Sequence, residues 1–267
     1  MKLNKLLLLT LTTATLALAA CGKGGDAPNA GGGEATPAQE AKVLRVGTNA
    51  EFAPFEYMGD DGKIVGFDID LMDAMAQAGG FKVVYKHQPW DGIFASLTSG
   101  DNDVVLSAVT ITPERGQSMD FSNPYFEIRQ VMLVPETSTI KNTDGLKTAK
   151  KVGVVTGQTG DLAVSKMLGA TSDKVARYDT VTLAAKALQN GGVEVVVSDS
   201  AAIQTYAKNN PEDQFVVIEV NDFPKEEYGI AVRKGDQATL TMLNDALQKV
   251  RDSGEYDKVY NQHFGLR

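Results

Sequence analysis

The segment FKVVYKHQPWDGIFASLTSGDNDVVLS, residues 81–107, determines the fold class. Its first part, residues 81–85, and its last part, residues 103–107, are short apolar runs that are typical of strands. Between them, residues 92–98 have helical spacing and end before Gly100, a residue type that often terminates helices. A strand, a helix and a second strand in this order predict an α/β fold.

Strand and helix patterns continue on both sides of this segment. Further strands are predicted at 43–47, 151–155, 175–178, 193–197 and 228–233, and further helices at 69–76, 161–168, 181–189, 199–208 and 236–251. Two extended segments, 130–134 and 228–232, join the two series, which predicts two lobes with a ligand in the cleft between them. The expected boundaries are 42–133 for the first part of lobe 1, 134–228 for lobe 2 and 229–267 for the second part of lobe 1.

The first twenty residues have the layout of a secretory signal. Lys2 and Lys5 precede an uncharged run, residues 6–20, that is shorter than the roughly 20 residues needed to span a bilayer as a helix. The residues LAAC at 18–21 resemble a bacterial lipobox, in which the signal is cleaved and the cysteine receives a lipid. We therefore expect an exported protein that Cys21 anchors to a membrane facing the periplasm, with the choice of inner or outer membrane left open.

Residues 21–41, which are rich in Gly, Ala and Pro, predict a flexible tether that reaches on the order of 60 to 70 Å when extended.

The charge and the cysteine content limit the partners and the fold that this chain can have. The net charge is −8, and it becomes −10 when Lys2 and Lys5 are removed, which argues against nucleic acid and anionic membrane surfaces as partners. The single cysteine excludes a disulfide framework. The sequence predicts a monomer without cofactor or metal.

The hexapeptide TITPER, residues 110–115, directly follows a predicted buried strand. Thr112 is a good helix N-cap and Pro113 a natural first helical residue, so we expect a helix to begin there, with free backbone N–H groups that favour an anion. Arg115 in the first turn could bind a carboxylate with two parallel hydrogen bonds. The alternative is an ordinary cap with a surface arginine.

Two further loops follow predicted strands. The turn TGQTG, residues 156–160, has the glycines of an anion-binding loop without the Lys that a phosphate loop would carry. Ser198 and Asp199 directly follow the predicted strand at 193–197, and both are candidate ligand-binding residues. Asp199 is either the N-cap of the next helix or the counter-ion of an ammonium group. Taken together, Arg115 for a carboxylate and Asp199 for an ammonium predict an α-amino acid as the ligand.

Six motifs carry a resemblance to a known family. They are GTNAEFAPFE at 47–56, GFDIDL at 66–71, TITPER at 110–115, MDFSNPY at 119–125, GVVTGQTG at 153–160 and GEYDKVY at 254–260. In these motifs the chain, from about residue 42 onward, resembles the periplasmic solute-binding proteins of polar amino-acid ABC transporters. That family includes receptors for glutamine, histidine, lysine/ornithine and arginine.

The resemblance implies a type II periplasmic binding protein fold. Each lobe has a central sheet flanked by helices, two hinge crossings join the lobes, and the closed form is read by a membrane permease. The ligand-binding positions that it implies are Arg115 for the carboxylate, Asp199 for the ammonium, Ala108, Thr110 and Thr159 around them, and the aromatic walls Phe52 and Trp90.

The substrate is less clear from the family pattern. Many relatives have an aspartate where this chain has Asn49, which argues against a cationic ligand. Glutamine receptors have a lysine and a histidine where this chain has Val155 and Ser198, so glutamine is not indicated either. We expect a neutral or weakly polar side chain near Asn49, Glu51, Phe52 and Trp90, while Glu51 keeps a cation open.

Two other functions compete with capture of an amino acid. Cyclohexadienyl dehydratases resemble the same family, but they would need an acid or base in the cleft, for which Glu51 and Glu56 are the candidates. The histidines, His87 and His263, lie outside the site motifs. The second alternative is a surface adhesin or a sensor domain that uses the same fold.

Overall fold

The computed structural model describes residues 41–265. The predicted signal, Cys21 and most of the predicted tether lie outside the described residues. Within residues 41–265, no helix is both long enough and apolar enough to cross a bilayer.

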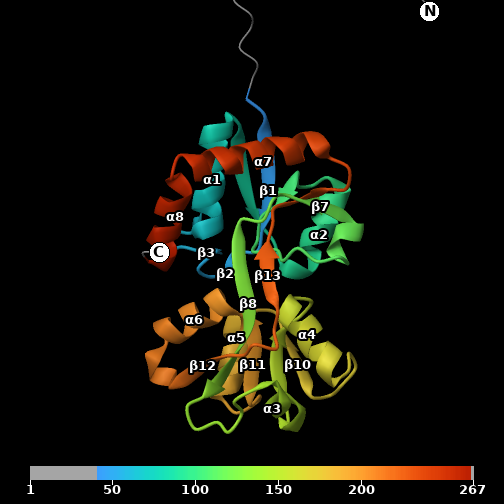
Figure 1. Cartoon of the computed structure of the whole chain (residues 1–267), viewed down its shortest axis with the longest axis vertical. Helices are drawn as coiled ribbons and strands as arrows, with labels where there is room; N and C mark the ends of the chain where they lie inside the picture. Colours follow the sequence, from blue (N-terminus) through green and yellow to red (C-terminus); the bar gives the residue numbers. More distant parts are fainter. Residues whose placement is uncertain (1–40, 266–267) are drawn as a thin grey trace, which may run out of the picture. The chain divides into compact units, whose positions relative to one another are not determined.

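The first lobe is built on a sheet that includes the first strand of the described chain. Its strands are β1 (Val43–Thr48), β5 (Lys82–His87), β6 (Val104–Val105), β7 (Met119–Phe121) and β14 (Ala231–Arg233). Their order is β5–β1–β6–β14–β7, with β1 parallel to β5 and β6, and β14 antiparallel to β6 and β7. Figure 1 shows this sheet in the lobe that also carries the helices α1 (Phe67–Gly79), α2 (Trp90–Ser99), α7 (Gln237–Asp252) and α8 (Glu255–Phe264).

The second sheet forms the other lobe. Its strands are β8 (Phe126–Pro135), β9 (Val152–Val155), β10 (Val175–Tyr178), β11 (Val195–Asp199), β12 (Phe215–Glu219) and β13 (Lys225–Tyr228). The order is β10–β9–β11–β8–β12, and β13 pairs with β8 outside this path. Its helices are α3 (Thr143–Thr148), α4 (Thr159–Leu168), α5 (Val181–Gln189) and α6 (Ser200–Asn209), with a 3₁₀ turn at Pro211–Asp213. The predicted two-lobed α/β fold is therefore confirmed.

Helix α1 illustrates how local sequence sets an element. Gly66 precedes it with φ 131°, a backbone conformation that favours glycine, and Gly80 ends it in the left-handed conformation with φ 70°. The buried residues Phe67, Leu71 and Met75 lie on one face at a spacing of four. The predicted stop at the glycine pair is confirmed.

Two strands carry the chain between the lobes, β8 on the way out and β13 on the way back (Figure 1). They pair antiparallel, with Tyr228 opposite Phe126. The predicted strand at 228–233 is interrupted, because β13 ends at Tyr228 and β14 begins at Ala231. This break lets one extended segment contribute to both sheets.

The helix expected after Thr112 is absent. The structure has only a 3₁₀ turn at Arg115–Gln117, preceded by Glu114 in helical conformation. Thr112 Oγ1 still accepts a hydrogen bond from Arg115 N, at 3.2 Å, but three residues do not build a row of free N–H groups. The predicted α-helix at this position was therefore wrong, and the anion-binding role of Arg115 stays a prediction that does not depend on a helix start. The chain also forms a small sheet that the sequence patterns missed, from β2 (Glu51–Phe52), β3 (Glu56–Met58) and β4 (Ile64–Val65).

Candidate functional site

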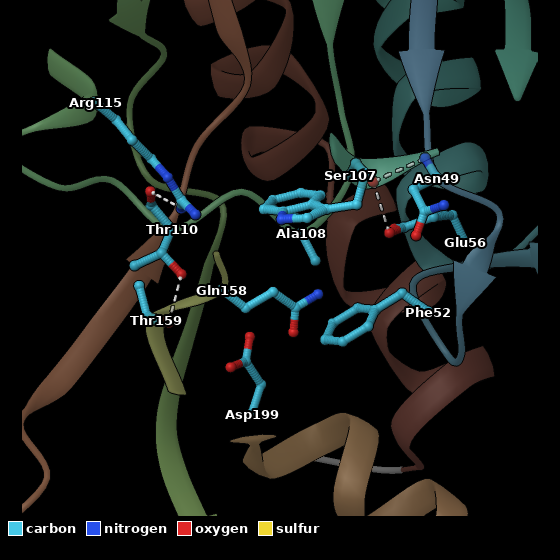
Figure 2. Close-up of a pocket in the computed structure, with 11 residues that line it drawn as sticks. Asn49, Phe52, Glu56, Ser107, Ala108, Thr110, Arg115, Gln158, Thr159 and Asp199 are labelled. Atoms are coloured by element: carbon cyan, nitrogen blue, oxygen red, sulfur yellow. Dashed lines mark hydrogen bonds between the residues drawn. The ribbon is translucent and has the colours of Figure 1, made fainter. Parts of the chain in front are cut away.

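A small cavity lies where residues from both lobes meet. Figure 2 shows the side chains that surround it. Those of the first lobe are Asn49, Phe52, Glu56, Trp90, Ser107, Ala108, Thr110 and Arg115, and those of the second lobe are Gln158, Thr159 and Asp199. Most of these residues are at or just beyond the ends of strands, where parallel sheets place their ligand sites.

Arg115 is held in place from several sides. Its Nη1 donates to Thr110 O at 2.8 Å, and its Nη2 donates across the lobes to Gly157 O at 3.3 Å. The guanidinium carbon lies 5.4 Å from the centroid of the Trp90 ring and 5.3 Å from that of Phe94, which is within cation–π range. A guanidinium has five N–H donors, so these two bonds fix its plane without exhausting its donors.

Asp199 supplies the opposite charge. It is the N-cap residue of α6, yet its side chain makes no capping hydrogen bond and instead accepts from Gln130 Nε2 at 2.6 Å and from the Tyr228 hydroxyl. Burial raises the pKa of Asp199 to about 6, against the lowering effect of these two hydrogen bonds and of the Arg115 charge. The carboxylate is therefore mostly ionised at neutral pH although it is buried.

Hydroxyl groups connect the two lobes beside these charges. Thr110 Oγ1 and Thr159 Oγ1 are 3.4 Å apart across the cavity, and Gln130 Nε2 donates to Thr159 Oγ1 at 3.0 Å. Ala108 has φ 46°, which is uncommon for a residue other than glycine, and its N–H donates to Asp68 Oδ2 at 2.9 Å. The structure thus holds the backbone of Ala108 in a conformation that alanine rarely adopts.

The other end of the cavity carries an acid and an amide. The Ser107 hydroxyl donates to Glu56 Oε1 at 2.9 Å and accepts from Asn49 N at 3.0 Å, as Figure 2 shows. Asn49 Nδ2 donates to Glu51 Oε2 at 3.1 Å. Burial, followed by the neighbouring carboxyl of Asp68, raises the pKa of Glu56 well above its ordinary value.

Comparison with known proteins identifies the family. Residues 44–266 match the model of bacterial extracellular solute-binding proteins, family 3. The chain belongs to this family. A probable histidine-binding protein of Neisseria gonorrhoeae is 55% identical over 265 residues, which cover 99% of this chain and 97% of the relative.

Solved structures give the same family. The arginine-, lysine-, histidine-binding protein ArtJ of Geobacillus stearothermophilus has a TM-score of 0.80 and 44% identity, over 84% of this chain and 96% of that chain. An ancestral arginine-binding protein bound to arginine has a TM-score of 0.79 and 42% identity, over 85% of this chain and 100% of that chain. These relatives are binding proteins, in agreement with the expectation that this chain is not an enzyme.

The structure brings together most of the residues that the sequence indicated for this solute-binding protein. Those that line the cavity are Asn49, Phe52, Trp90, Ala108, Thr110, Arg115, Thr159 and Asp199. Among the described residues, no group of three or more His, Cys, Asp or Glu side chains could hold a metal ion.

Two expected residues, Glu51 and Ser198, lie outside the cavity lining. Each is next to a residue that lines it, Phe52 in β2 and Asp199 at the end of β11. Successive side chains of a strand point to opposite faces, so a residue adjacent to a lining residue in a strand points away. Glu51 is exposed and accepts a hydrogen bond from the lining residue Asn49, whereas Ser198 is buried on the other face.

Three lining residues were missed: Glu56, Ser107 and Gln158. Glu56 belongs to the motif at 47–56, and the sequence indicates for it only the role of an acid or base in an enzyme. Gln158 lies in the turn at 156–160, whose glycines indicate a role for the backbone and give no signal for a side chain. In Figure 2 its side chain extends between Asp199 and Phe52.

Proposed function

We propose that this protein captures an α-amino acid and delivers it to the permease of an ABC importer. The observation that carries the proposal is the placement of Arg115 and Asp199 around one cavity, each from a different lobe. A guanidinium with unused donors suits a carboxylate, and a buried carboxylate suits an ammonium group. The names of the relatives, which refer to histidine and arginine, support the same ligand class.

Closure of the lobes would complete the site. Arg115 and Thr110 belong to the first lobe, and each has a polar contact with the second lobe, to Gly157 and Thr159 respectively. A ligand that binds first to Arg115 would meet Asp199 only when the lobes approach. Hinge closure of this kind couples capture to a shape that a permease can recognise.

For the ligand side chain we propose a cationic amino acid, histidine or arginine. The sequence favoured a neutral side chain because Asn49 replaces an aspartate, but Glu56 adds a carboxyl group to the same end of the cavity. The aromatic rings of Phe52 and Trp90 suit a planar imidazole or guanidinium group.

A thermal-shift screen of the mature protein against the common amino acids tests this function. A ligand present at a hundredfold excess over its Kd stabilises the native state by about 2.7 kcal/mol. Each kcal/mol of stabilisation raises the Tm of a domain of this size by roughly 2–4 °C. We expect arginine or histidine to give the largest shift and agmatine, which lacks the α-carboxylate of arginine, to give little. If no amino acid changes the Tm, the protein does not capture amino acids.

We further propose that a lipid on Cys21 retains the receptor at a bacterial membrane. The support is the sequence LAAC at 18–21, followed by a tether of about twenty residues. Wild-type protein expressed in bacteria should partition with membranes and incorporate labelled palmitate, and Cys21→Ser should lose both properties. Labelling that persists in Cys21→Ser would contradict the proposed anchor.

A further inference from the structure

Two fully buried carboxyl groups lie together at the side-chain end of the cavity. Glu56, the first residue of β3, lines the cavity, and Asp68, the second residue of α1, lies behind it. Both have a relative exposure of 0%. Burying even one ionised carboxylate is costly, so two adjacent ones require an explanation.

Hydrogen bonds account for one oxygen of each group. Glu56 Oε1 accepts from the Ser107 hydroxyl at 2.9 Å. Asp68 Oδ2 accepts from Ala108 N at 2.9 Å and from the Tyr125 hydroxyl at 2.8 Å. The other oxygens, Glu56 Oε2 and Asp68 Oδ1, are buried and have no partner within the described part of the chain.

These two unpartnered oxygens belong to side chains that are neighbours. Ionised carboxylates only accept hydrogen bonds, so the two groups cannot satisfy each other without a proton. One proton on Glu56 would give a donor for Asp68 and would remove one of the two buried charges. Two carboxyl groups that share a site and a proton are a known arrangement.

The surroundings favour keeping that proton. The titratable groups that face the two acids are the buried hydroxyls of Tyr125 and Tyr228, the carboxyl of Asp199, the hydroxyl of Tyr85 on β5 and, from α8, His263. His263 Nε2 is 2.7 Å from Asp70 Oδ2, so its nearest acid is on the surface side of α1. Burial raises the pKa of Asp68 to about 6, and burial, followed by the neighbouring carboxyl of Asp68, raises the pKa of Glu56 well above its ordinary value.

We propose that Glu56 and Asp68 hold one proton between them, and that this proton is released to solvent when a cationic side chain binds beside Glu56. The proposal rests on the proposed function, since it assumes an amino acid in the cavity. The bound cation would replace the proton as the charge that balances Glu56, so the pair loses one positive charge as the site gains one. A neutral side chain would leave the proton in place.

Proton release gives the affinity a defined dependence on pH. A cation binds the deprotonated pair, so its Kd should fall as the pH rises, by up to tenfold per pH unit for one proton, until the pair of the free protein has itself ionised. Citrulline has nearly the shape of arginine without the charge, and its Kd should lack this contribution. Both ligands bring the same α-ammonium group to Asp199. The difference in pH dependence between the two Kd values therefore reports on the Glu56–Asp68 pair alone.

Calorimetry in two buffers of different ionisation enthalpy measures the protons released on binding. At neutral pH, we expect arginine to release up to one proton more than citrulline does with wild-type protein. Glu56→Gln should bring the two ligands to the same value. Asp73→Asn is the matched control, because Asp73 lies on α1 as well but bonds to the Tyr85 hydroxyl at the surface, and it should behave as wild type.

Infrared spectroscopy of the ligand-free wild-type protein tests for the shared proton without a ligand or a variant. We expect the carbonyl stretch of a buried, protonated carboxyl group. The band should disappear when arginine is added and persist when citrulline is added. Absence of that band at neutral pH, or binding of arginine and citrulline with equal proton release, would overturn the proposal. Failure of every amino acid to bind would overturn the proposed function, and with it the ligand-driven release, while the band would still report whether the pair holds a proton.

Discussion

Replacing Arg115 with alanine should weaken the binding of arginine by about 30-fold or more, because loss of one partner of a buried charge pair costs about 2–5 kcal/mol. The guanidinium is fixed by bonds to Thr110 O and Gly157 O and by the rings of Trp90 and Phe94, so it is ordered before a carboxylate arrives. Arg115→Lys keeps the charge but loses the two-pronged geometry, and we expect an intermediate loss. Calorimetry with arginine measures each Kd.

The loss must be distinguished from damage to lobe closure, because Arg115 also contacts Gly157 across the cavity. Agmatine, which has no carboxylate, makes this separation. Wild-type protein should prefer arginine to agmatine strongly, and Arg115→Ala should lose most of that preference. Arg45→Ala is the control, because Arg45 pairs with Asp103 at the surface, away from the cavity. An unchanged preference in Arg115→Ala would mean that another group binds the carboxylate.

The sequence was sufficient to predict the parts of the fold that follow periodicity. Helix α1, with its glycine stop, and the strands β9 and β11 were found within a few residues because burial imposes the spacing. Asp199 was found because an acid at the end of a buried strand has few roles. In the structure Asp199 is the N-cap residue of α6 by position, makes no capping hydrogen bond with its side chain and lines the cavity, and its role as the counter-ion of an ammonium group stays a prediction.

What the sequence could not predict depends on tertiary contacts. TITPER has the composition of a helix start, but the chain turns after Arg115–Gln117 and enters β7. Glu51 and Ser198 have suitable chemistry and point the wrong way, which only the register of a strand reveals. Glu56 gains its importance from Asp68, which comes from a different element and has no local signal in the motif around Glu56.

Changing Asp199 to asparagine should also weaken amino-acid binding by about 30-fold or more, since it removes the buried anion that balances the α-ammonium group. The wild-type affinity for a neutral amino acid such as citrulline should fall as the pH decreases through about 6, the pKa of Asp199 in the ligand-free protein. Below that pH the carboxyl is protonated and must lose its proton to bind a cation, which costs up to tenfold per pH unit. Asp199→Asn should not show this dependence, and Kd measurements across that pH range test it.

The same substitution should stabilise the ligand-free protein at neutral pH. Folding raises the pKa of Asp199 from 3.8 to about 6. The protonated carboxyl therefore contributes stability that is fully present below pH 3.8 and is lost as the pH rises through about 6. A shift of this size corresponds to about 3 kcal/mol as an upper limit. Asparagine avoids that cost, and Gln130 can turn its amide so that Oε1, which has no partner within residues 41–265, accepts from the new Nδ2.

Denaturant unfolding without ligand should therefore show Asp199→Asn to be more stable than wild type at neutral pH and similar to it near pH 3.8. A variant that loses both binding and stability would indicate that Asp199 is a structural residue, whereas gain of stability with loss of binding is typical of a group held in place for a ligand.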